Sequence, residues 1–363
     1  MMAFCNCSAV IKIRMGFFQT WFISLKEHGG MVIIMIRKIA DRVVNGNDTN
    51  WAMNINSFDW VPGVGLYGIF DAYKKTGDKK YFDFLIDWAE KHLDEAYKKQ
   101  TINSVAPMLT IAELYNITKN EKYYKVCTDL AEYVTKTAPV TSEGGLEHTV
   151  TEPGAGFAEQ MWADTLFMAC LFLAKFGKYA EKEEYVKFAQ NQLLIHLKAL
   201  RDEKTGLFYH GYSCIYKNHL SGIKWGRANA WIIFSATEIL KTAPDFDGAD
   251  FVKGAIGAQI KALKPLQRKS GGFGTVLDDS DSYDEISATA GIAAGVRAAA
   301  ELGIADEPQI YENAVNAVKS AVDETGTVTG VSSGTPIMKD AQAYKNIICE
   351  PTLYGQALAI LAM

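Results

Sequence analysis

The sequence has no long block of basic residues, no apolar segment of membrane-spanning length near its N-terminus, and almost no sustained alternation of apolar and polar residues. With a formal net charge of -5, the chain lacks the surface typical of nucleic-acid binding. The apolar segment at residues 15–25 is too short to cross a bilayer. The near-absence of β alternation argues against a sheet-based fold. We therefore expect a helical protein with neither nucleic acid nor a membrane as a partner.

Cysteine occurs at six positions but never in the paired clusters that bind zinc. The only close pair is Cys5 and Cys7, whereas a structural zinc site usually combines two C-x2-4-C clusters. Three of the other cysteines lie within helical apolar patterns. We expect reduced cysteines in the core, as in a cytoplasmic protein.

Residues 1–30 form an N-terminal extension that does not share the pattern of the rest of the chain. They fit an extension, disordered or upstream of the true start, better than a signal peptide, and Met15, Met31 and Met35 each offer a later start. Residues 31–363 are expected to form a single domain. With 48% hydrophobic residues, the chain has enough apolar side chains for a large core.

Residues 31–363 read as alternating amphipathic and strongly apolar helices. Helices of the amphipathic set open with an acidic or lysine-rich turn and an aromatic residue, as in Asp78–Phe82 and Glu121–Tyr124. A recurring unit of this kind is typical of an array of helical hairpins. Six helices of each set predict an all-α (α/α)6 toroid, a six-hairpin barrel with short strands in the loops at the cleft; an open helical solenoid is the alternative. The expected inner helices lie near 60–74, 103–117, 160–176, 225–241, 285–302 and 350–362.

One acidic residue stands within the third apolar stretch. In Glu159–Met168, E-Q-M-W-A-D-T-L-F-M, Asp164 precedes an apolar run, which predicts a buried helix with Asp164 one or two turns from its start. A buried carboxylate is costly unless it is paired, protonated or facing a polar cavity. Gln160 would lie one turn before it on roughly the same face. We interpret Asp164 as a catalytic acid; the alternative is an acid that stabilises the helix N-terminus.

Glycine-containing loops with aromatic residues or histidine precede several inner helices, at 143–148, 205–210 and 270–274. In a toroid the starts of the inner helices surround one cavity, where aromatic rings and hydrogen-bonding groups are suited to sugar binding. His148 and His210 end two of these loops, and Trp162 precedes Asp164. All three are candidates for substrate binding. The alternatives are histidines with a surface or turn role and a core tryptophan.

A second cluster, W-G-R-A-N-A-W at Trp225–Trp231, opens the fourth inner helix. Arg227 is a cation among apolar residues and requires an anionic partner, either a substrate carboxylate or an internal salt bridge. Trp225 and Trp231 are six positions apart, so at most one of them can stack on a sugar. Trp60, at the start of the first inner helix, is a further candidate for the wall of the same mouth.

A glycosidase normally uses two carboxylates that flank the scissile bond. The loop before the second inner helix offers Asn103 instead of an acid. Glu285 is either a partner acid or the cap of the fifth inner helix. A lone acid indicates unusual glycoside chemistry.

Together, the motifs G-G-L-E-H ending at His148, E-Q-M-W-A-D-T-L-F-M, T-G-L-F-Y-H and W-G-R-A-N-A-W resemble glycoside hydrolase family 105, the unsaturated rhamnogalacturonyl hydrolases. The resemblance covers about residues 35–363, and the sister family 88, the unsaturated glucuronyl hydrolases, shares the fold. It implies a catalytic (α/α)6 domain without metal or cofactor, acting on small oligosaccharides that end in a 4,5-unsaturated uronic acid. Asp164 would protonate C4 and then help activate the water that adds at C5.

The same resemblance implies that four residues bind the unsaturated sugar: His148, Trp162, Arg227 and Trp231. Arg227 would face the carboxylate. Asn103 departs from the second aspartate that many family members have, which makes the preferred leaving sugar an open question.

Two other functions stay open at this point. An ordinary inverting glycosidase or a sugar epimerase of the same fold would act on saturated sugars and would need a second acid or a histidine pair. A carbohydrate-binding barrel without activity would bind unsaturated uronides and not turn them over. The sequence leaves open the sugar linked to the uronide and the choice between monomer and homodimer.

Overall fold

The computed structural model describes residues 30–152 and 156–363. The expectation for the N-terminal extension lies outside the described residues, except for residue 30. No helix within these ranges is both long and apolar enough to cross a membrane.

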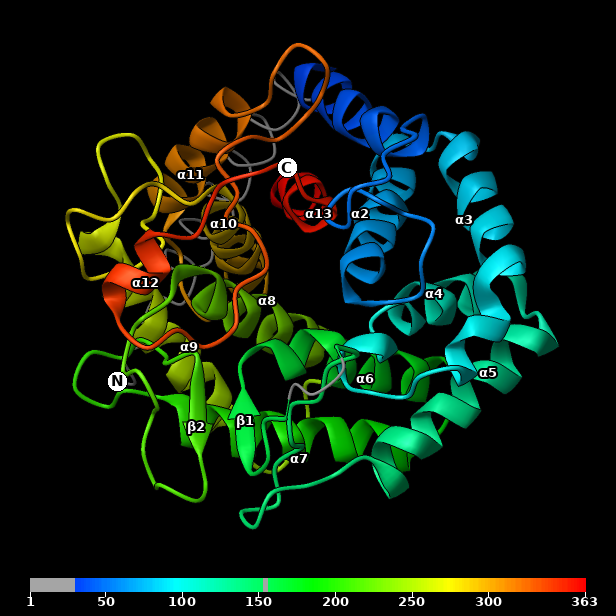
Figure 1. Cartoon of the computed structure of the whole chain (residues 1–363), viewed down its shortest axis with the longest axis horizontal. Helices are drawn as coiled ribbons and strands as arrows, with labels where there is room; N and C mark the ends of the chain where they lie inside the picture. The colour runs from blue at the N-terminus through cyan, green and yellow to red at the C-terminus, as the bar shows by residue number, and fades with distance from the viewer. Residues whose placement is uncertain (1–29, 153–155) are drawn as a thin grey trace, which may run out of the picture.

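Six helices form the inner layer of the described chain, and they close into a ring (Figure 1). Helix α2 packs on α4, α4 on α6, α6 on α8, α8 on α10, and α10 on α13, which returns to α2. The closed ring confirms the predicted (α/α)6 toroid and rules out the open solenoid. The inner helices are α2 (Trp60–Thr76), α4 (Met108–Thr118), α6 (Leu171–Tyr179), α8 (Gly226–Thr242), α10 (Ile286–Glu301) and α13 (Leu353–Ala362).

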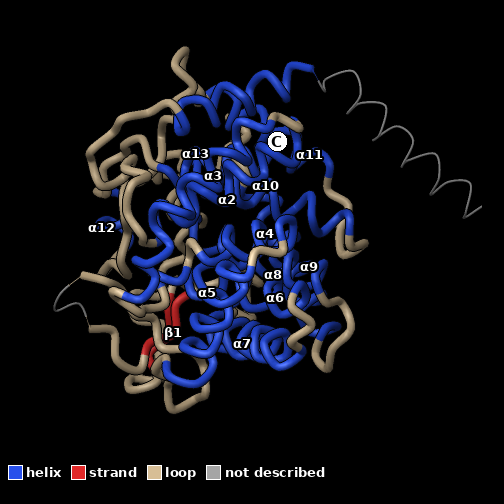
Figure 2. The backbone as a smooth tube through the Cα atoms, turned by 90° about the vertical axis from the view of Figure 1, so that its right-hand side faces the viewer, coloured by secondary structure: helices blue, strands red, loops and turns tan. Residues whose placement is uncertain are grey.

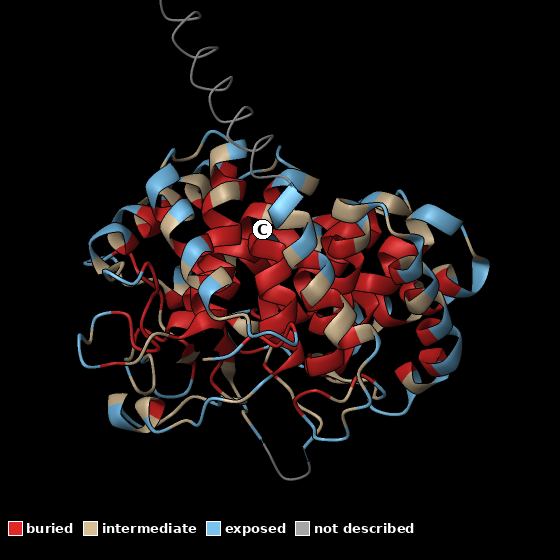
Figure 3. Ribbon diagram, turned by 90° about the horizontal axis from the view of Figure 1, so that it is seen from above, coloured by how far each residue is buried: buried red, intermediate tan, exposed pale blue. Residues whose placement is uncertain are grey.

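An outer layer of amphipathic helices covers this ring, with buried faces turned inward and exposed faces outward (Figure 3). Burial of one apolar stripe per helix is the expected source of its stability. The outer members are the helical residues 30–44, α3 (Lys79–His92), α5 (Glu121–Glu132), α7 (Glu183–Leu200), α9 (Ala249–Leu263) and α11 (Pro308–Ser320).

The turn signals in the sequence end one helix and begin the next. Gly77 closes α2 in the left-handed conformation with φ 67°, and the side chain of Asp78 then caps α3. Lys119 and Asn120 do the same between α4 and α5. This chemistry explains why an acidic or amide residue stands just before each of these two amphipathic helices.

Glycine in the inner helices allows their backbones to approach closely. A Cβ atom at Gly68 of α2 would lie 2.5 Å from the Cα of Ala357 in α13. A Cβ atom at Gly295 of α10 would lie 2.5 Å from a side-chain carbon of Ile233 in α8. The glycine content of the apolar stretches therefore serves the closure of the ring.

The loops and the short elements gather at one end of the ring, where the inner helices begin (Figure 2). Strands β1 (Gln160–Trp162) and β2 (Gly211–Ser213) pair antiparallel there. The connection from α11 to α13, which carries α12 (Ala341–Lys345), also lies at this end. The remaining short elements are η1 (Leu93–Tyr97), η2 (Asn103–Val105), η3 (Tyr133–Thr137), η4 (Leu166–Cys170) and η5 (Lys264–Leu266).

Toward the opposite end, the later turns of the inner helices hold a buried group of charges. The ammonium of Lys175 in α6 lies 3.3 Å from Glu113 of α4 and 3.4 Å from Glu238 of α8. Burial lowers the pKa of Lys175, but Tyr67 and these two carboxylates outweigh this effect, so that its pKa lies above the usual value. Tyr179 donates a hydrogen bond to Glu113 as well, at 2.9 Å. One cation thus joins three neighbouring helices of the ring.

Candidate active site

Asp164 lies at the start of the helical segment that continues through η4 into α6, directly after strand β1. The prediction that it lies one or two turns into the helix is wrong, and Gln160 is on the strand instead of on the same helix face. A strand of three residues gives no recognisable alternation, and its partner strand is far away in the sequence. The pairing brings the carbonyl of His210 within 2.9 Å of the amide of Ala163, which sets His210 beside Asp164.

Asp164 and His210 form the centre of the site. Nε2 of His210 lies 3.2 Å from Oδ2 of Asp164; the pair lacks the alignment of a regular hydrogen bond, and neither atom has another partner. Catalytic hydrogen bonds are often loose until the substrate is bound. Burial lowers the pKa of His210, an effect that Asp164 offsets only in part. Burial raises the pKa of Asp164, but His210, His148 and Arg227 outweigh it, so that its pKa lies below the usual value.

Trp162 and His148 form a stacked pair next to this centre. Their ring centroids are 4.5 Å apart with an interplanar angle of 10°. The indole of Trp162 also meets the ring of His210 edge-on at 5.2 Å, and its N–H donates to the side chain of Gln160 at 3.0 Å. Nδ1 of His148 lies 3.0 Å from the hydroxyl of Thr165. The four predicted residues His148, Gln160, Trp162 and His210 are therefore brought together around Asp164.

Two buried histidines make the stability of the fold depend on pH. Burial lowers the pKa of His148 to about 4 and does the same for His196 of α7, whose ring is fully buried. Between pH 6.5 and 4 the unfolded chain binds protons at these positions and the folded chain does not. Folding free energy is therefore lost as the pH falls through this window, by about 3 kcal/mol for each histidine at pH 4.

We expect the variant His196→Gln to flatten this pH dependence. Urea unfolding at pH 7.5 and pH 4 measures the fall in the free energy of unfolding, which should be smaller in the variant by about 3 kcal/mol. Equal falls in the variant and the wild type would contradict the assignment.

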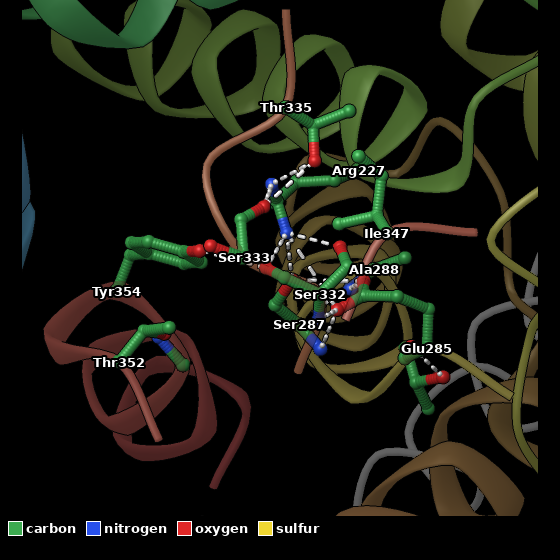
Figure 4. Close-up of polar contacts among 12 residues, drawn as sticks. Arg227, Glu285, Ser287, Ala288, Ser332, Ser333, Thr335, Ile347, Thr352 and Tyr354 are labelled. Carbon is green, nitrogen blue, oxygen red and sulfur yellow. Dashed lines mark hydrogen bonds and ion pairs between the residues drawn. The ribbon is translucent and has the colours of Figure 1, made fainter. Parts of the chain in front are cut away.

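Arg227 is almost completely enclosed, with 1% of its surface exposed. One guanidinium nitrogen, Nη1, donates to Ser287 and to both oxygens of Ser332; the other, Nη2, donates to Ser333 and Thr335 (Figure 4). Nη1 also lies 3.7 Å from the carboxylate of Glu285. The internal salt bridge, one of the two alternatives from the sequence, is thus formed. The partners of Nη2, Ser333 and Thr335, are half-buried, whereas Ser287 and Ser332 at Nη1 are buried.

Glu285 acts as the cap of α10 in this structure. Its carboxylate accepts hydrogen bonds from the amides of Ser287, Ala288 and Ser332, and it is fully buried. Of the two readings of Glu285, the capping role is the one observed. It is therefore not placed as a second catalytic acid.

The other predicted residues lie along the same mouth or directly beneath it. The ring centroids of Trp225 and His210 are 4.2 Å apart, and the guanidinium carbon of Arg227 lies 4.5 Å from the ring centroid of Trp225. Trp60 stacks on Tyr354 at 5.1 Å, and Tyr354 in turn lies 4.7 Å from the same guanidinium.

Asn103 and Trp231 complete the set of predicted residues. The backbone N–H of Asn103 donates a hydrogen bond to the carbonyl of Thr149, the residue after His148. The 3-10 turn η2, which begins at Asn103, packs on η4. Trp231 is fully buried, and its ring centroid lies 4.8 Å from that of Phe167.

Several buried polar atoms at this end have no hydrogen-bonding partner in the protein. Folded proteins rarely leave such atoms unpaired, so a group of them indicates a place where a ligand or water completes the bonding. Among the described residues, those in the predicted site are Asn103 Oδ1, Asp164 Oδ2, His210 Nε2, Trp225 Nε1 and Trp231 Nε1.

Tyr344 of α12 and the segment 332–335 also belong to this site, although no sequence motif indicates them. The hydroxyl of Tyr344 lies 2.8 Å from Nδ1 of His210. Both come from the long connection between α11 and α13, which carries no motif and is folded over the mouth by contacts distant in sequence. Within the described ranges, no group of three or more His, Cys, Asp or Glu side chains is arranged to hold a metal ion.

A closed ring of helical hairpins with an acid, two histidines and several tryptophans at its mouth defines the class of six-hairpin glycoside hydrolases. Residues 35–363 match the family model Glycosyl Hydrolase Family 88. The chain belongs to this family, and it is a glycoside hydrolase. The resemblance to family 105 and its sister family 88 is confirmed.

Named relatives and solved structures agree with this placement. The chain is 36% identical to the unsaturated rhamnogalacturonyl hydrolase YesR of Bacillus subtilis over 330 residues, which cover 90% of this chain and 93% of the relative. A structure from Salmonella enterica, described as a possible member of family 105, superposes with a TM-score of 0.86 at 31% identity, covering 91% and 92% of the two chains. The unsaturated glucuronyl hydrolase of Bacillus sp. GL1 shares the fold, with a TM-score of 0.70 at 15% identity, covering 92% and 94%.

Proposed function

We propose that this enzyme removes a 4,5-unsaturated uronic acid from the non-reducing end of oligosaccharides produced by a polysaccharide lyase. The observation that carries the proposal is the set of groups around Asp164. Those that act most strongly on its charge are His210, His148 and Arg227, none of which is a carboxylate, and the carboxylate of Glu285 is engaged in capping α10. An ordinary glycosidase would need a second carboxylate within about 10 Å of the first.

One carboxyl group is sufficient when the substrate itself holds a reactive double bond. Asp164 delivers a proton to C4 of the vinyl ether, and the ring oxygen stabilises the positive charge that develops at C5. Asp164, now a carboxylate, accepts a proton from the water that adds at C5. The resulting hemiketal opens by cleavage of the bond between C5 and the ring oxygen. The acetal at C1 thereby becomes a hemiacetal, which releases the leaving sugar as an alcohol.

Binding of the substrate favours the protonated form of Asp164 that this step requires. In the free protein the pKa of Asp164 is lowered, so that its carboxylate form prevails at neutral pH. A bound uronate brings a second negative charge into a buried site, which raises the proton affinity of Asp164. We place that uronate carboxylate at the Nη2 side of Arg227, where it would replace Ser333 and Thr335 as acceptors of the guanidinium hydrogens.

The other site residues hold the sugar ring in this proposal. The stacked pair of Trp162 and His148 presents an aromatic face beside Asp164, and Gln160 fixes the indole. Asn103, with its free Oδ1, accepts a hydrogen bond from a sugar hydroxyl without adding charge. The further binding residues proposed are Trp60, His210, Trp225 and Trp231, the last through its unpaired N–H.

The cysteines support a cytoplasmic location for the enzyme. Cys127, Cys170 and Cys214 are buried free thiols, and Cys349 is an exposed one. An exposed free thiol is typical of a reducing compartment.

A panel of lyase digests tests the proposed function. The purified chain is incubated with unsaturated disaccharides from rhamnogalacturonan, from glycosaminoglycans and from other uronide polymers, and the ultraviolet absorbance of the conjugated double bond is followed. We expect loss of absorbance, fastest with the rhamnogalacturonan product because of the similarity to YesR. Cleavage of saturated oligosaccharides with no effect on the double bond would indicate an ordinary glycosidase, and binding without turnover would indicate an inactive barrel.

A further inference from the structure

Tyr344 is a buried tyrosine at the site that the proposed chemistry does not yet use. It lies on the short helix α12, and its side chain has no exposed surface. Its hydroxyl is 2.8 Å from Nδ1 of His210, and the two rings are 6.0 Å apart. The opposite nitrogen of the same imidazole faces Asp164. Tyr344, His210 and Asp164 therefore form a line across the mouth.

The direction of the hydrogen bond follows from the two sides of the imidazole. Nε2 of His210 faces Oδ2 of Asp164, and an ionised carboxylate can only accept a hydrogen bond, so that the ring hydrogen belongs at Nε2. Nδ1 is then an acceptor, 2.8 Å from the hydroxyl of Tyr344. Burial raises the pKa of this phenol. The phenol thus stays protonated, and its own hydrogen is directed to Nδ1 of His210.

An imidazole that accepts at Nδ1 carries its hydrogen at Nε2. We propose that Tyr344 is a positioning residue that holds His210 as the neutral Nε2–H tautomer, so that the imidazole donates to Oδ2 of Asp164. Oδ1 then remains for the proton that goes to the substrate. The catalytic part of this inference rests on the function proposed above.

The groups around His210 act on its protonation in opposite directions. Burial of the ring opposes a protonated imidazole, Asp164 favours it, and Arg227 opposes it; His148 is a further titratable group of the site. A charged His210 would stabilise the carboxylate form of Asp164 and leave less of the protonated form that delivers the proton to C4. Tyr344 counters this, since a hydrogen bond donated to Nδ1 occupies the lone pair that a second proton would need.

The variant Tyr344→Phe removes the hydroxyl and keeps the ring. We expect kcat to fall by about 10- to 100-fold and KM to change by less than about threefold. The reason is that the variant disturbs the protonation of Asp164 and leaves the contacts with the sugar in place. In the background of His210→Gln, the same change should cost less than about twofold, since the tyrosine acts through that histidine. The matched control is Tyr123→Phe, which removes the hydroxyl of another buried tyrosine, bonded to Glu90 on the outer layer, and should retain wild-type kcat.

A spectroscopic measurement tests the tautomer without any assay of activity. The chain is labelled with ¹⁵N-histidine, and the His210 signals are assigned by their loss in His210→Gln. We expect a protonated Nε2 and an unprotonated Nδ1 in the wild type near pH 7, and a higher His210 pKa in Tyr344→Phe. A wild-type Nδ1–H tautomer, an unchanged titration in the variant, or full additivity in the double variant would each overturn the inference. If only the proposed function were wrong, the wild type would turn over none of the digests. The NMR result for the His210 tautomer would still hold in that case.

Discussion

The variant Asp164→Asn should lose activity on unsaturated uronides by about 10³- to 10⁴-fold in kcat, because an amide can neither deliver a proton to C4 nor accept one from water. The change keeps the shape of the side chain and an oxygen that can still accept from His210. We therefore expect the melting temperature and the affinity for the substrate to change little. Steady-state kinetics on the rhamnogalacturonan product and calorimetric binding to the inactive variant measure the two effects separately.

The matched control for this variant is Asp48→Asn. Asp48 is also ion-paired, at 2.6 Å from Arg42, and it lies in the loop after the helical residues 30–44. It should keep wild-type kcat. Activity of Asp164→Asn within about tenfold of the wild type would remove Asp164 from the role of catalytic acid.

The variant Lys175→Met should lower the free energy of unfolding by about 3–5 kcal/mol, since it leaves Glu113 and Glu238 as buried carboxylates without their cation. The side chains of Lys175 and Glu113 are only 10% and 6% exposed, so that water cannot replace the lost interaction. Urea unfolding at pH 7 measures the loss. Activity of the folded fraction at low temperature should be retained, because this cluster lies away from the end that holds Asp164.

Two further variants show whether the loss arises from uncompensated charge. Lys241→Met removes a lysine that also pairs with Glu238 but is 31% exposed, and we expect a cost below about 1 kcal/mol. Adding Glu113→Gln and Glu238→Gln to Lys175→Met should restore much of the stability, because no unpaired carboxylate then remains buried. A Lys175→Met protein as stable as the wild type would show that the charges at this end of the ring do not hold the helices together.

The ring of helices could be predicted from the sequence because its causes are local. Apolar stretches containing glycine alternate with amphipathic ones, and residues such as Asp78 and Asn120 mark the helix starts. The acid was also visible, since a carboxylate in the middle of an apolar run requires an explanation. The candidates His148 and His210 could be placed at one mouth because each ends a loop that precedes an inner helix.

What could not be predicted depends on contacts between distant parts of the chain. The strand that ends just before Asp164 forms only because residues 211–213 pair with it. The enclosure of Arg227 depends on Glu285 and on the segment 332–335, and nothing in the spacing of these residues predicts that they meet. Tyr344 lies in a connection without periodicity, so its contact with His210 appears only in three dimensions.

The position at which the proton enters the substrate tests the central claim most directly. The wild-type enzyme is supplied with the unsaturated disaccharide in heavy water, and the released sugar is analysed by NMR during the first turnovers. Hydration by a single acid predicts one deuterium at C4, loss of the C4=C5 double bond and no such label with Asp164→Asn. A released sugar that keeps its double bond, with no deuterium at C4, would mean that the bond at C1 is hydrolysed in the ordinary way and would contradict the mechanism.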